Sequence, residues 1–467
     1  MIQRLVTLLL LVAGFLLLWT ATRTSLDTST RTLVAGVGLL SLLLGLLRVW
    51  WILRDPPRRP RRFSRQDQQG QPVLGIARSA GSTYVPFVQP DGHHQLQRVW
   101  QHDSSLRITP VASTALDVPI EHVAVASTEH GDRVFVAGGN RVFLAPAAPS
   151  EPFVELPFAT AQPGEAIEQV VAMAAIENVL FLLGRRGATH DLHAWNGSGE
   201  LVRIAVDLGS SVEPVRIHAT RRAGVPIVLT LLAKEGTCHL RGFSVSGSPM
   251  LRHDATRIRD VMTTASGLVV FRTSADVGAL RACAIPVHAD AVVELGRDIL
   301  PVVVAPYDIL VTKEAGDGVV VGRVDATGTL HPIAFHQATP ASGVYGIAVS
   351  GSAVHVLSNH GSVEAWIRDG ELLRANGTMP RPNTDIATLA ATPTVLCFAT
   401  TSFLHVAAGG RLTAVTDRGE LEKGSTIRQL LAVGDFFVFE AGREGQPSDL
   451  YLLEAGVGNT KTGRSPK

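Results

Sequence analysis

The chain has 467 residues and almost balanced charge, with 42 Lys and Arg against 41 Asp and Glu. Residues 1–65 hold ten Arg and two Asp, so the rest carries 32 basic and 39 acidic residues, a net charge of −7. This acidic part argues against nucleic-acid binding, which depends on neutralising phosphates. Cys238, Cys283 and Cys397 are too few and too widely spaced for a disulfide framework or a zinc knuckle, and indicate a reducing compartment.

Two apolar runs near the N-terminus predict a transmembrane hairpin over residues 1–53, with helices at about 5–21 and 33–53. A helix of the second length is about 31 Å long, which matches the hydrocarbon core. The first run has an alternative interpretation as a cleaved signal peptide, because Arg4 precedes it and Thr20-Ala21-Thr22 follows it. In the second run, Ser41 and Gly45 form a pair of small residues that would let the other helix approach closely.

A basic, proline-interrupted linker is predicted over residues 54–71. Arginines concentrate on the cytoplasmic side of membrane helices, so the large C-terminal part is expected in the cytoplasm, beneath an inner or plasma membrane. The same side chains could hold anionic lipid, since each is worth about 1 kcal/mol at a charged surface. The arginines given these topology and lipid roles are Arg54, Arg58, Arg59, Arg61 and Arg62.

Beyond the linker, a pattern of short apolar segments separated by glycine or polar turns recurs about every 40 residues. The eight units start near Glu121, Ile167, Pro214, Ile258, Ile299, Val344, Ile386 and Ile427. Repeats of this length made only of short strands predict an all-β fold over residues 72–467, a β-propeller of about eight blades, with seven or nine also possible. Pro72–Trp100 is less regular, and is expected either to close the ring or to form a degenerate blade of its own.

Two of the eight units contain an Ala-Trp pair after an apolar strand and a turn. One runs from Gly346-Ile-Ala-Val to Ala365-Trp366, and the other from Val171-Ala-Met-Ala to Ala194-Trp195. These units resemble repeats of the regulator-of-chromosome-condensation type. The resemblance implies a protein-binding platform that grips partners with loops on one propeller face. Trp195 and Trp366 occupy equivalent repeat positions, so we expect both to pack between blades.

The sequence lacks a Walker loop, a G-x-S-x-G elbow, HExxH and an EF-hand loop, so no catalytic residue, metal site or cofactor is predicted. His190, Asp191 and His193 form the tightest cluster of possible metal ligands. Strand alternation would send the two histidines to opposite faces, which disfavours a metal site there. The preferred function is a membrane-anchored scaffold that binds an unidentified protein. The alternative is an enzyme or small-ligand sensor with its site at the central channel of the propeller.

The turn after the second apolar segment of each repeat should emerge on the same propeller face, because strands alternate in direction. Mixed charge at these turns favours a protein partner over nucleic acid. The residues predicted for this binding face are Arg185, Arg186, Asp191, Lys234, Glu235, Arg272, Lys313, Glu314, His360 and Arg443.

Overall fold

The computed structural model forms two compact units, one of Met1–Arg59 with Gly456–Lys467 and one of Pro60–Ala455. We describe each unit by itself. The structure describes the chain except residues 1, 24–26, 55–60, 63–70, 73–76, 79–81, 104, 160–165, 207, 209–212, 235–236, 275–280, 290, 298, 305–308, 316–317, 338–343, 351–352, 359–362, 368–371, 376–385, 393–394, 401–403, 409–410, 415–420, 422–423, 444–448 and 456–467.

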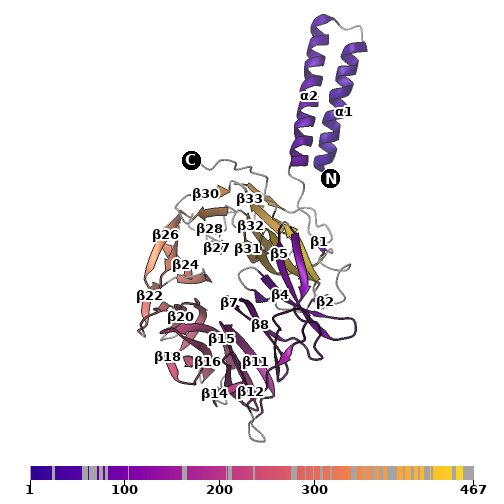
Figure 1. The fold of residues 1–467 in the computed structure, drawn as a ribbon. Coiled ribbons are helices and arrows are strands. Elements are labelled where there is room, and N and C mark those ends of the chain that lie inside the picture. Colours follow the sequence, from indigo (N-terminus) through magenta and orange to yellow (C-terminus); the bar gives the residue numbers. More distant parts are fainter. Residues whose placement is uncertain are drawn as a thin grey trace, which may run out of the picture. The chain divides into compact units, whose positions relative to one another are not determined.

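The first unit contains two antiparallel helices, α1 (Ile2–Arg23) and α2 (Thr28–Arg54), which pack against each other (Figure 1). Asp27 caps α2, accepting a hydrogen bond from the Thr30 amide at 3.2 Å. The Arg31 guanidinium donates to the Ala21 carbonyl at 2.8 Å and ties the two helices together at the connecting turn. Both helices therefore form where the two apolar runs predict them.

Glycines form the close contact between the two helices. A Cβ atom on Gly14 would lie 2.9 Å from the Gly38 carbonyl oxygen, and one on Gly38 would lie 3.0 Å from the Leu18 amide nitrogen. The predicted small pair contributes in part, because Gly45 is buried and Ser41 is half-buried. One described stretch, Thr28–Leu46 in α2, is long and apolar enough to cross a bilayer, whereas the apolar stretch Val12–Thr22 in α1 is shorter.

The second unit is built from short antiparallel strands that form nine sheets in the described residues, numbered 1 to 9 in chain order. Sheet 1 contains β2 (Gln71–Pro72), β3 (Ala77–Arg78), β4 (Ser82–Val88), β5 (His94–His102) and β6 (Ser105–Pro110). Sheet 2 contains β7 (His122–Thr128), β8 (Gly131–Gly138), β9 (Arg141–Leu144) and β10 (Val154–Glu155). Sheet 3 contains β11 (Gln169–Ile176), β12 (Val179–Arg186), β13 (Thr189–Trp195) and β14 (Val202–Ala205).

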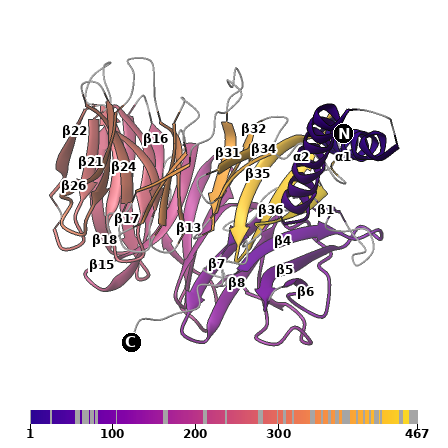
Figure 2. The same cartoon turned by 90° about the horizontal axis from the view of Figure 1, so that it is seen from above.

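Sheet 4 contains β15 (Glu213–Arg222), β16 (Val225–Lys234), β17 (Thr237–Ser244) and β18 (Pro249–Ala255). Sheet 5 contains β19 (Arg257–Thr263), β20 (Val269–Ser274), β21 (Arg281–Ile285) and β22 (Val293–Arg297). Sheet 6 contains β23 (Ile299–Val304), β24 (Ile309–Ala315), β25 (Gly318–Val324) and β26 (Leu330–Gln337). In the view of Figure 2, β21 and β22 of sheet 5 lie side by side as antiparallel neighbours.

Sheet 7 contains β27 (Val344–Ser350), β28 (Ala353–Ser358), β29 (Val363–Ile367) and β30 (Leu372–Ala375). Sheet 8 contains β31 (Ile386–Ala391), β32 (Val395–Thr400), β33 (Leu404–Ala408) and β34 (Arg411–Ala414). Sheet 9 contains β35 (Thr426–Val433), β36 (Phe436–Gly442), β37 (Asp449–Glu454) and β1 (Arg61–Arg62).

The sheets follow one another around a closed ring (Figure 1). The first strand of each sheet from β7 onward contacts the first strand of the next, as far as β31 against β35. Sheet 9 then meets sheet 1 through β35 against β5 and β2 against β37, and β3 of sheet 1 contacts β7. A closed ring of four-stranded antiparallel sheets, each one a blade, is a β-propeller.

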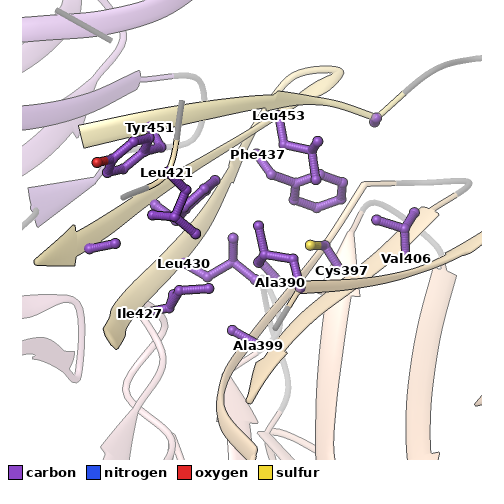
Figure 3. Packing of buried hydrophobic residues seen from close by; sticks show 14 of the residues in the cluster. Ala390, Cys397, Ala399, Val406, Leu421, Ile427, Leu430, Phe437, Tyr451 and Leu453 are labelled. Carbon is purple, nitrogen blue, oxygen red and sulfur yellow. The ribbon is translucent and has the colours of Figure 1, made fainter. Parts of the chain in front are cut away.

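Burial explains the composition of the strands. The second strands β12 and β36 are covered on both faces by neighbouring sheets, which is why they read as continuous apolar runs. The fourth strands β10 and β14 are short and mostly exposed or half-buried. Figure 3 shows one inter-sheet core, where Phe437 and Leu430 of sheet 9 lie near Ala390, Cys397 and Val406 of sheet 8. Each strand's place in its sheet therefore sets its hydrophobicity.

The nine sheets of the described residues exceed the favoured count of eight and agree with the alternative of nine. The described strands of residues 71–110 form a sheet of their own, in which the short strands β2 and β3 both pair with β4. Part of the predicted linker is also ordered, because β1 pairs with β37 and supplies the fourth strand of sheet 9. Pro72–Trp100 therefore belongs to a blade of its own, and the outer strand of sheet 9 comes from Arg61–Arg62, which precede that segment.

Candidate interaction surface

Because the strands of each sheet alternate in direction, the ring has two ends. At one end, which we name the 1–2 end, lie the turns that connect the first strand to the second and the third strand to the fourth. At the other end, which we name the 2–3 end, lies the turn that connects the second strand to the third. The turns predicted to bind a partner all belong to the 2–3 end.

Contacts between neighbouring sheets fasten the turns of the 1–2 end. The Tyr84 hydroxyl of sheet 1 donates to the Asp132 carboxylate of sheet 2 at 2.7 Å, and burial is the largest cause that raises the Tyr84 pKa. The Thr220 hydroxyl of sheet 4 donates to the Thr264 carbonyl of sheet 5 at 2.6 Å. Gly267 has a φ of 109°, and a Cβ there would collide with the Arg221 carbonyl oxygen. These turns therefore serve the packing of the ring.

At the 2–3 end, two of the predicted partner residues are exposed. Arg185 lies near the end of β12, and Arg443 directly follows β36. They come from sheets 3 and 9, so the structure brings predicted residues from distant parts of the sequence to one end of the ring. Arg443 also accepts a hydrogen bond through its carbonyl oxygen from Arg428 at 3.4 Å.

Asp191 is not the exposed turn residue that the sequence suggested. It lies within β13 and its side chain is fully buried. Its Oδ2 atom lies 3.0 Å from Arg186 Nε and 3.6 Å from Arg203 Nη1. A buried carboxylate needs such charged partners. Asp191 and the neighbouring Arg186 therefore hold sheet 3 together.

Arg272 also differs from the prediction, because it is half-buried inside β20 and pairs across the sheet with Arg259. Lys234, Lys313 and Glu314 lie at or near strand ends, and their side chains are outside the described part of the structure. Glu235 and His360 lie outside the described residues altogether. Of the topology arginines, Arg54 ends α2, Arg61 and Arg62 form β1, and Arg58 and Arg59 lie outside the described residues.

Sheet 5 carries four arginines that the sequence analysis missed, in addition to Arg272, which it predicted. All four of its strands carry arginine near the 2–3 end, and these side chains are Arg257, Arg259, Arg272, Arg281 and Arg297. The register places Arg259 directly opposite Arg272 and Arg281 directly opposite Arg297. The available signal was the arginine at the start or end of each strand of this repeat. The strand pairing was needed to show that they share one end of the sheet, with Arg257, Arg259 and Arg272 on one face and Arg281 and Arg297 on the other.

The same end carries acidic side chains on sheets 2 and 3. Glu121 and Glu168 are exposed where the chain enters β7 and β11. Arg141 bridges Asp117 at 2.9 Å and Glu155 at 2.8 Å, and this pairing lowers the Glu155 pKa. At the 2–3 end, sheets 2 and 3 therefore carry mixed charge, with Glu121 and Glu168 alongside the exposed Arg185, whereas the strand ends of sheet 5 carry arginines.

The first strand is bulged close to the 2–3 end in sheets 3 to 9. Each register shift lies within the first few residues of the strand, and the shifts fall between Val170/Ala172, Pro214/Arg216, Arg259/Met262, Pro301/Val303, Val344/Gly346, Ile386/Thr388 and Ile427/Gln429. A bulge redirects side chains and bends a strand. The repeat therefore carries a recurrent irregularity at the end of the ring predicted to bind a partner.

The histidine cluster behaves as strand alternation predicts. On β13, Trp195 packs into the core with sheet 2, whereas Leu192 and Ala194 pack toward sheet 4, so residues separated by odd intervals face opposite ways. Burial lowers the His193 pKa to about 4. Trp195 lies edge-on to Phe135 of sheet 2, with ring centroids 5.7 Å apart, which confirms its packing role. Within the described residues, no group of three or more His, Cys, Asp and Glu could hold a metal ion.

No protein-family model matches the chain, and no curated protein matches it. Solved structures similar to it include YCF48 from Cyanidioschyzon merolae, at 12% identity and a TM-score of 0.36, over 72% of this chain and 96% of that chain. A structure of YCF48 bound to D1 peptide shares 12% identity at a TM-score of 0.35, over 73% of this chain and 95% of that chain. Human WBSCR16 shares 12% identity at a TM-score of 0.35, over 67% and 92% of the two chains.

Proposed function

We propose that this protein is a membrane-anchored scaffold whose propeller binds another protein at the cytoplasmic surface of an inner or plasma membrane. The observation that supports the anchor is that α1 and α2 bury small residues between them and expose large apolar ones, the reverse of a helix pair in water. Small residues fill the contact between the helices, while large apolar side chains face outward, with Leu33 69% and Phe15 65% exposed. In water such a surface would be costly, whereas in lipid it is solvated by acyl chains.

The arginines after α2 support the orientation, because basic residues remain on the cytoplasmic side. The 2–3 end of the ring supports the binding role, since it presents exposed charged side chains from several sheets, and the turns of the opposite end are fastened to neighbouring sheets. The resemblance of two repeats to the regulator-of-chromosome-condensation type agrees with a platform for proteins. Loops carried on a rigid scaffold are the usual place for such contacts.

The anchor is tested by labelling single cysteines with a membrane-impermeant reagent. Thr28→Cys lies at the turn between the helices and Ser198→Cys on an exposed turn of the propeller, in a background with the three native cysteines changed to Ala. In intact cells, only the Thr28→Cys protein should be labelled, and permeabilisation should expose Ser198→Cys. Labelling of Ser198→Cys in intact cells would contradict the orientation, and release of the full chain by alkaline carbonate would contradict the anchor.

The binding role is tested by chemical cross-linking of the full chain in its membrane, followed by identification of the attached protein. Charge reversal at Arg185 and Arg443 should remove the cross-linked partner and leave the thermal melt unchanged, because both side chains are exposed. The matched control reverses Glu129 and Glu200, which are exposed at the 1–2 end. Loss of the partner with the control variant, and not with the first, would contradict this choice of surface.

A further inference from the structure

The junction between sheets 9 and 1, which we name the seam, closes the ring. Sheets 1 to 8 are each built from consecutive strands, whereas sheet 9 combines β35, β36 and β37 with β1 from the other part of the sequence. In the described residues, β1 pairs with β37 at two positions, Arg61 with Leu452 and Arg62 with Tyr451. Noncovalent contacts alone therefore hold β35, β36 and β37 against β1 and sheet 1.

The side chain of Gln101 crosses the seam. Gln101 lies near the end of β5, and its Oε1 atom accepts a hydrogen bond from the Asp435 amide of sheet 9 at 2.6 Å. Its Nε2 atom donates to the Asp435 carboxylate at 3.1 Å and to the Asp103 carbonyl at 2.7 Å. At other junctions, the Tyr84 and Thr220 hydroxyls donate one hydrogen bond each. The Gln101 amide thus fixes both the main chain and the side chain of Asp435.

Asp435 connects this contact to all three C-terminal strands of sheet 9. It lies in the turn between β35 and β36, and its carbonyl accepts a hydrogen bond at 2.8 Å from the amide of Ala455, which directly follows β37. Next to the turn, Val433 and Val438 pack into one core with Val85 of sheet 1. The Gln101 contact therefore holds the three strands over the apolar core of the seam.

Gly434 shows that the turn is shaped around Gln101. Its φ is 57°, in the left-handed region that favours glycine, and a Cβ there would overlap the Gln101 amide group. Gly187 has nearly the same φ, 58°, but no atom lies within 4 Å of a Cβ placed on it. The bound amide, as well as the backbone, therefore excludes a side chain at position 434.

We propose that Gln101 is a latch that controls opening of the ring at the seam, where β35, β36 and β37 separate from sheet 1 as one unit. Folded proteins open locally in contiguous units of this kind. Gln101 is half-buried and Asp435 is exposed, so water can replace the three hydrogen bonds when they break. The latch sets how often the seam opens, and burial of the apolar core closes it again.

Hydrogen–deuterium exchange of the full chain in detergent micelles tests the latch. Gln101→Ala should speed exchange of β35 and β36 amides about tenfold, because three hydrogen bonds are lost. Amides of sheets 4 and 5 should be unaffected. The matched control, Thr220→Val, removes the hydrogen bond between sheets 4 and 5 and should leave sheet 9 unchanged. No acceleration in β35 and β36 with Gln101→Ala, or equal acceleration in every sheet, would overturn the proposal.

A nearly isosteric change tests whether the latch acts through Asp435. Gln101→Glu keeps an acceptor for the Asp435 amide but loses both donated hydrogen bonds and places two carboxylates together, so β36 should exchange faster than in the unaltered protein. Adding Asp435→Asn removes the repulsion and restores a donor. Exchange of β36 should then slow about threefold or more relative to Gln101→Glu alone. Exchange that stays as fast in the double variant would contradict the latch.

The two glycines with matched backbone separate the latch from backbone strain. Gly434→Ala and Gly187→Ala place alanine at nearly the same positive φ, but only Gly434→Ala displaces the Gln101 amide. Gly434→Ala should speed exchange in β35 and β36, and its effect should be smaller in a chain that already carries Gln101→Ala. Gly187→Ala should leave the seam unchanged. Full additivity of Gly434→Ala and Gln101→Ala would show that the glycine does not act through the latch, and the proposal would fail.

Discussion

At the scale of single residues, burial decides whether a polar side chain in this ring supports the fold or is available to a partner. Asp191 and Arg185 lie six positions apart in one repeat and were both predicted for the binding face. Asp191 is fully buried between two arginines, and Arg185 is exposed. The difference arises because the hairpin turns at Gly187 and Ala188, so Asp191 has already entered the next strand.

His193 predicts how the fold responds to acid. Burial is the largest cause that lowers its pKa to about 4, from an ordinary 6.5. In the unfolded chain the imidazole takes up a proton as the pH falls below about 6.5, whereas in the fold it stays neutral until about pH 4. Stability is therefore lost as the pH falls through this window. Between pH 7 and pH 5, His193 should account for about 2 kcal/mol of lost stability.

Thermal melts of the full chain at pH 7 and pH 5 measure this effect. His193→Gln should melt lower at pH 7 but lose less on acidification than the unaltered protein. The matched control is His130→Gln at an exposed turn, which should keep the full pH dependence. An unchanged pH dependence in His193→Gln would contradict the assignment. Burial also lowers the pKa of His94, His190, His253 and His405, so some acid sensitivity should remain in every variant.

At the scale of elements, the two helices and the strand β1 perform structural tasks that their sequences show only in part. The helices are apolar enough to be recognised in the sequence, but which residues lie at their contact depends on how each helix is rotated about its own axis. Gly36 and Gly38 are two positions apart on α2. No atom lies within 4 Å of a Cβ placed on Gly36, whereas one on Gly38 would crowd the Leu18 amide and the Gly14 carbonyl.

These two glycines provide a matched pair of substitutions. Gly38→Leu should push the helices apart, since overpacking costs about 1–3 kcal/mol, and Gly36→Leu should have no such effect. Hydrogen–deuterium exchange of α1 amides in micelles measures the outcome. Faster exchange of α1 in Gly38→Leu than in Gly36→Leu is expected. Identical exchange in the two variants would contradict the packing of α1 on α2.

The strand β1 joins the segment after the helices to the ring. Arg61 and Arg62 pair with Leu452 and Tyr451 of β37, and proline at both positions would remove the amides that pair with β37. The double change Arg61→Pro and Arg62→Pro should lower the melting temperature of the full chain. Arg61→Ala with Arg62→Ala removes the same charges but keeps the amides, and should melt at a higher temperature than the proline variant. Equal melting of the two double variants would show that β1 contributes no stability.

At the scale of the whole molecule, ring closure makes each sheet depend on two neighbours. Sheet 9 shares one core with sheet 8, which includes Phe437 and Leu430, and another with sheet 1, which includes Val438 and Val85. Opening the ring at this point would expose both cores and leave unpaired strand edges. The stability of any one sheet is therefore a property of the closed ring.

Truncation tests this dependence. A chain that ends before Thr426 loses the three main strands of sheet 9 and should aggregate, because the apolar side chains of sheets 1 and 8 are uncovered. A chain that ends at Ala455 keeps every described strand of the ring and should remain monodisperse in detergent. Size-exclusion chromatography with light scattering distinguishes the two results. A monodisperse, cooperatively melting product of the first truncation would contradict the closed ring.

The sequence alone determined the two helices, the all-β character of the rest and most of the repeats. Apolar runs and short Val, Leu and Phe segments carry these features locally, because a strand covered on both faces must be apolar along its length. Sheet 1 fitted the repeat pattern least, and the sequence left open whether Pro72–Trp100 closes the ring or forms a blade of its own.

Only the tertiary structure decided which charged residues lie at the same end of a sheet. Arg257 and Arg297 are 40 positions apart, and the register of β19 to β22 alone brings them to the same end of one sheet. Register likewise assigns Asp191 to the interior, and the rotation of α2 about its axis assigns Gly38 to the helix contact. Local sequence sets what a segment can form. Strand pairing and helix rotation, which depend on partners distant in the chain, set where each side chain points.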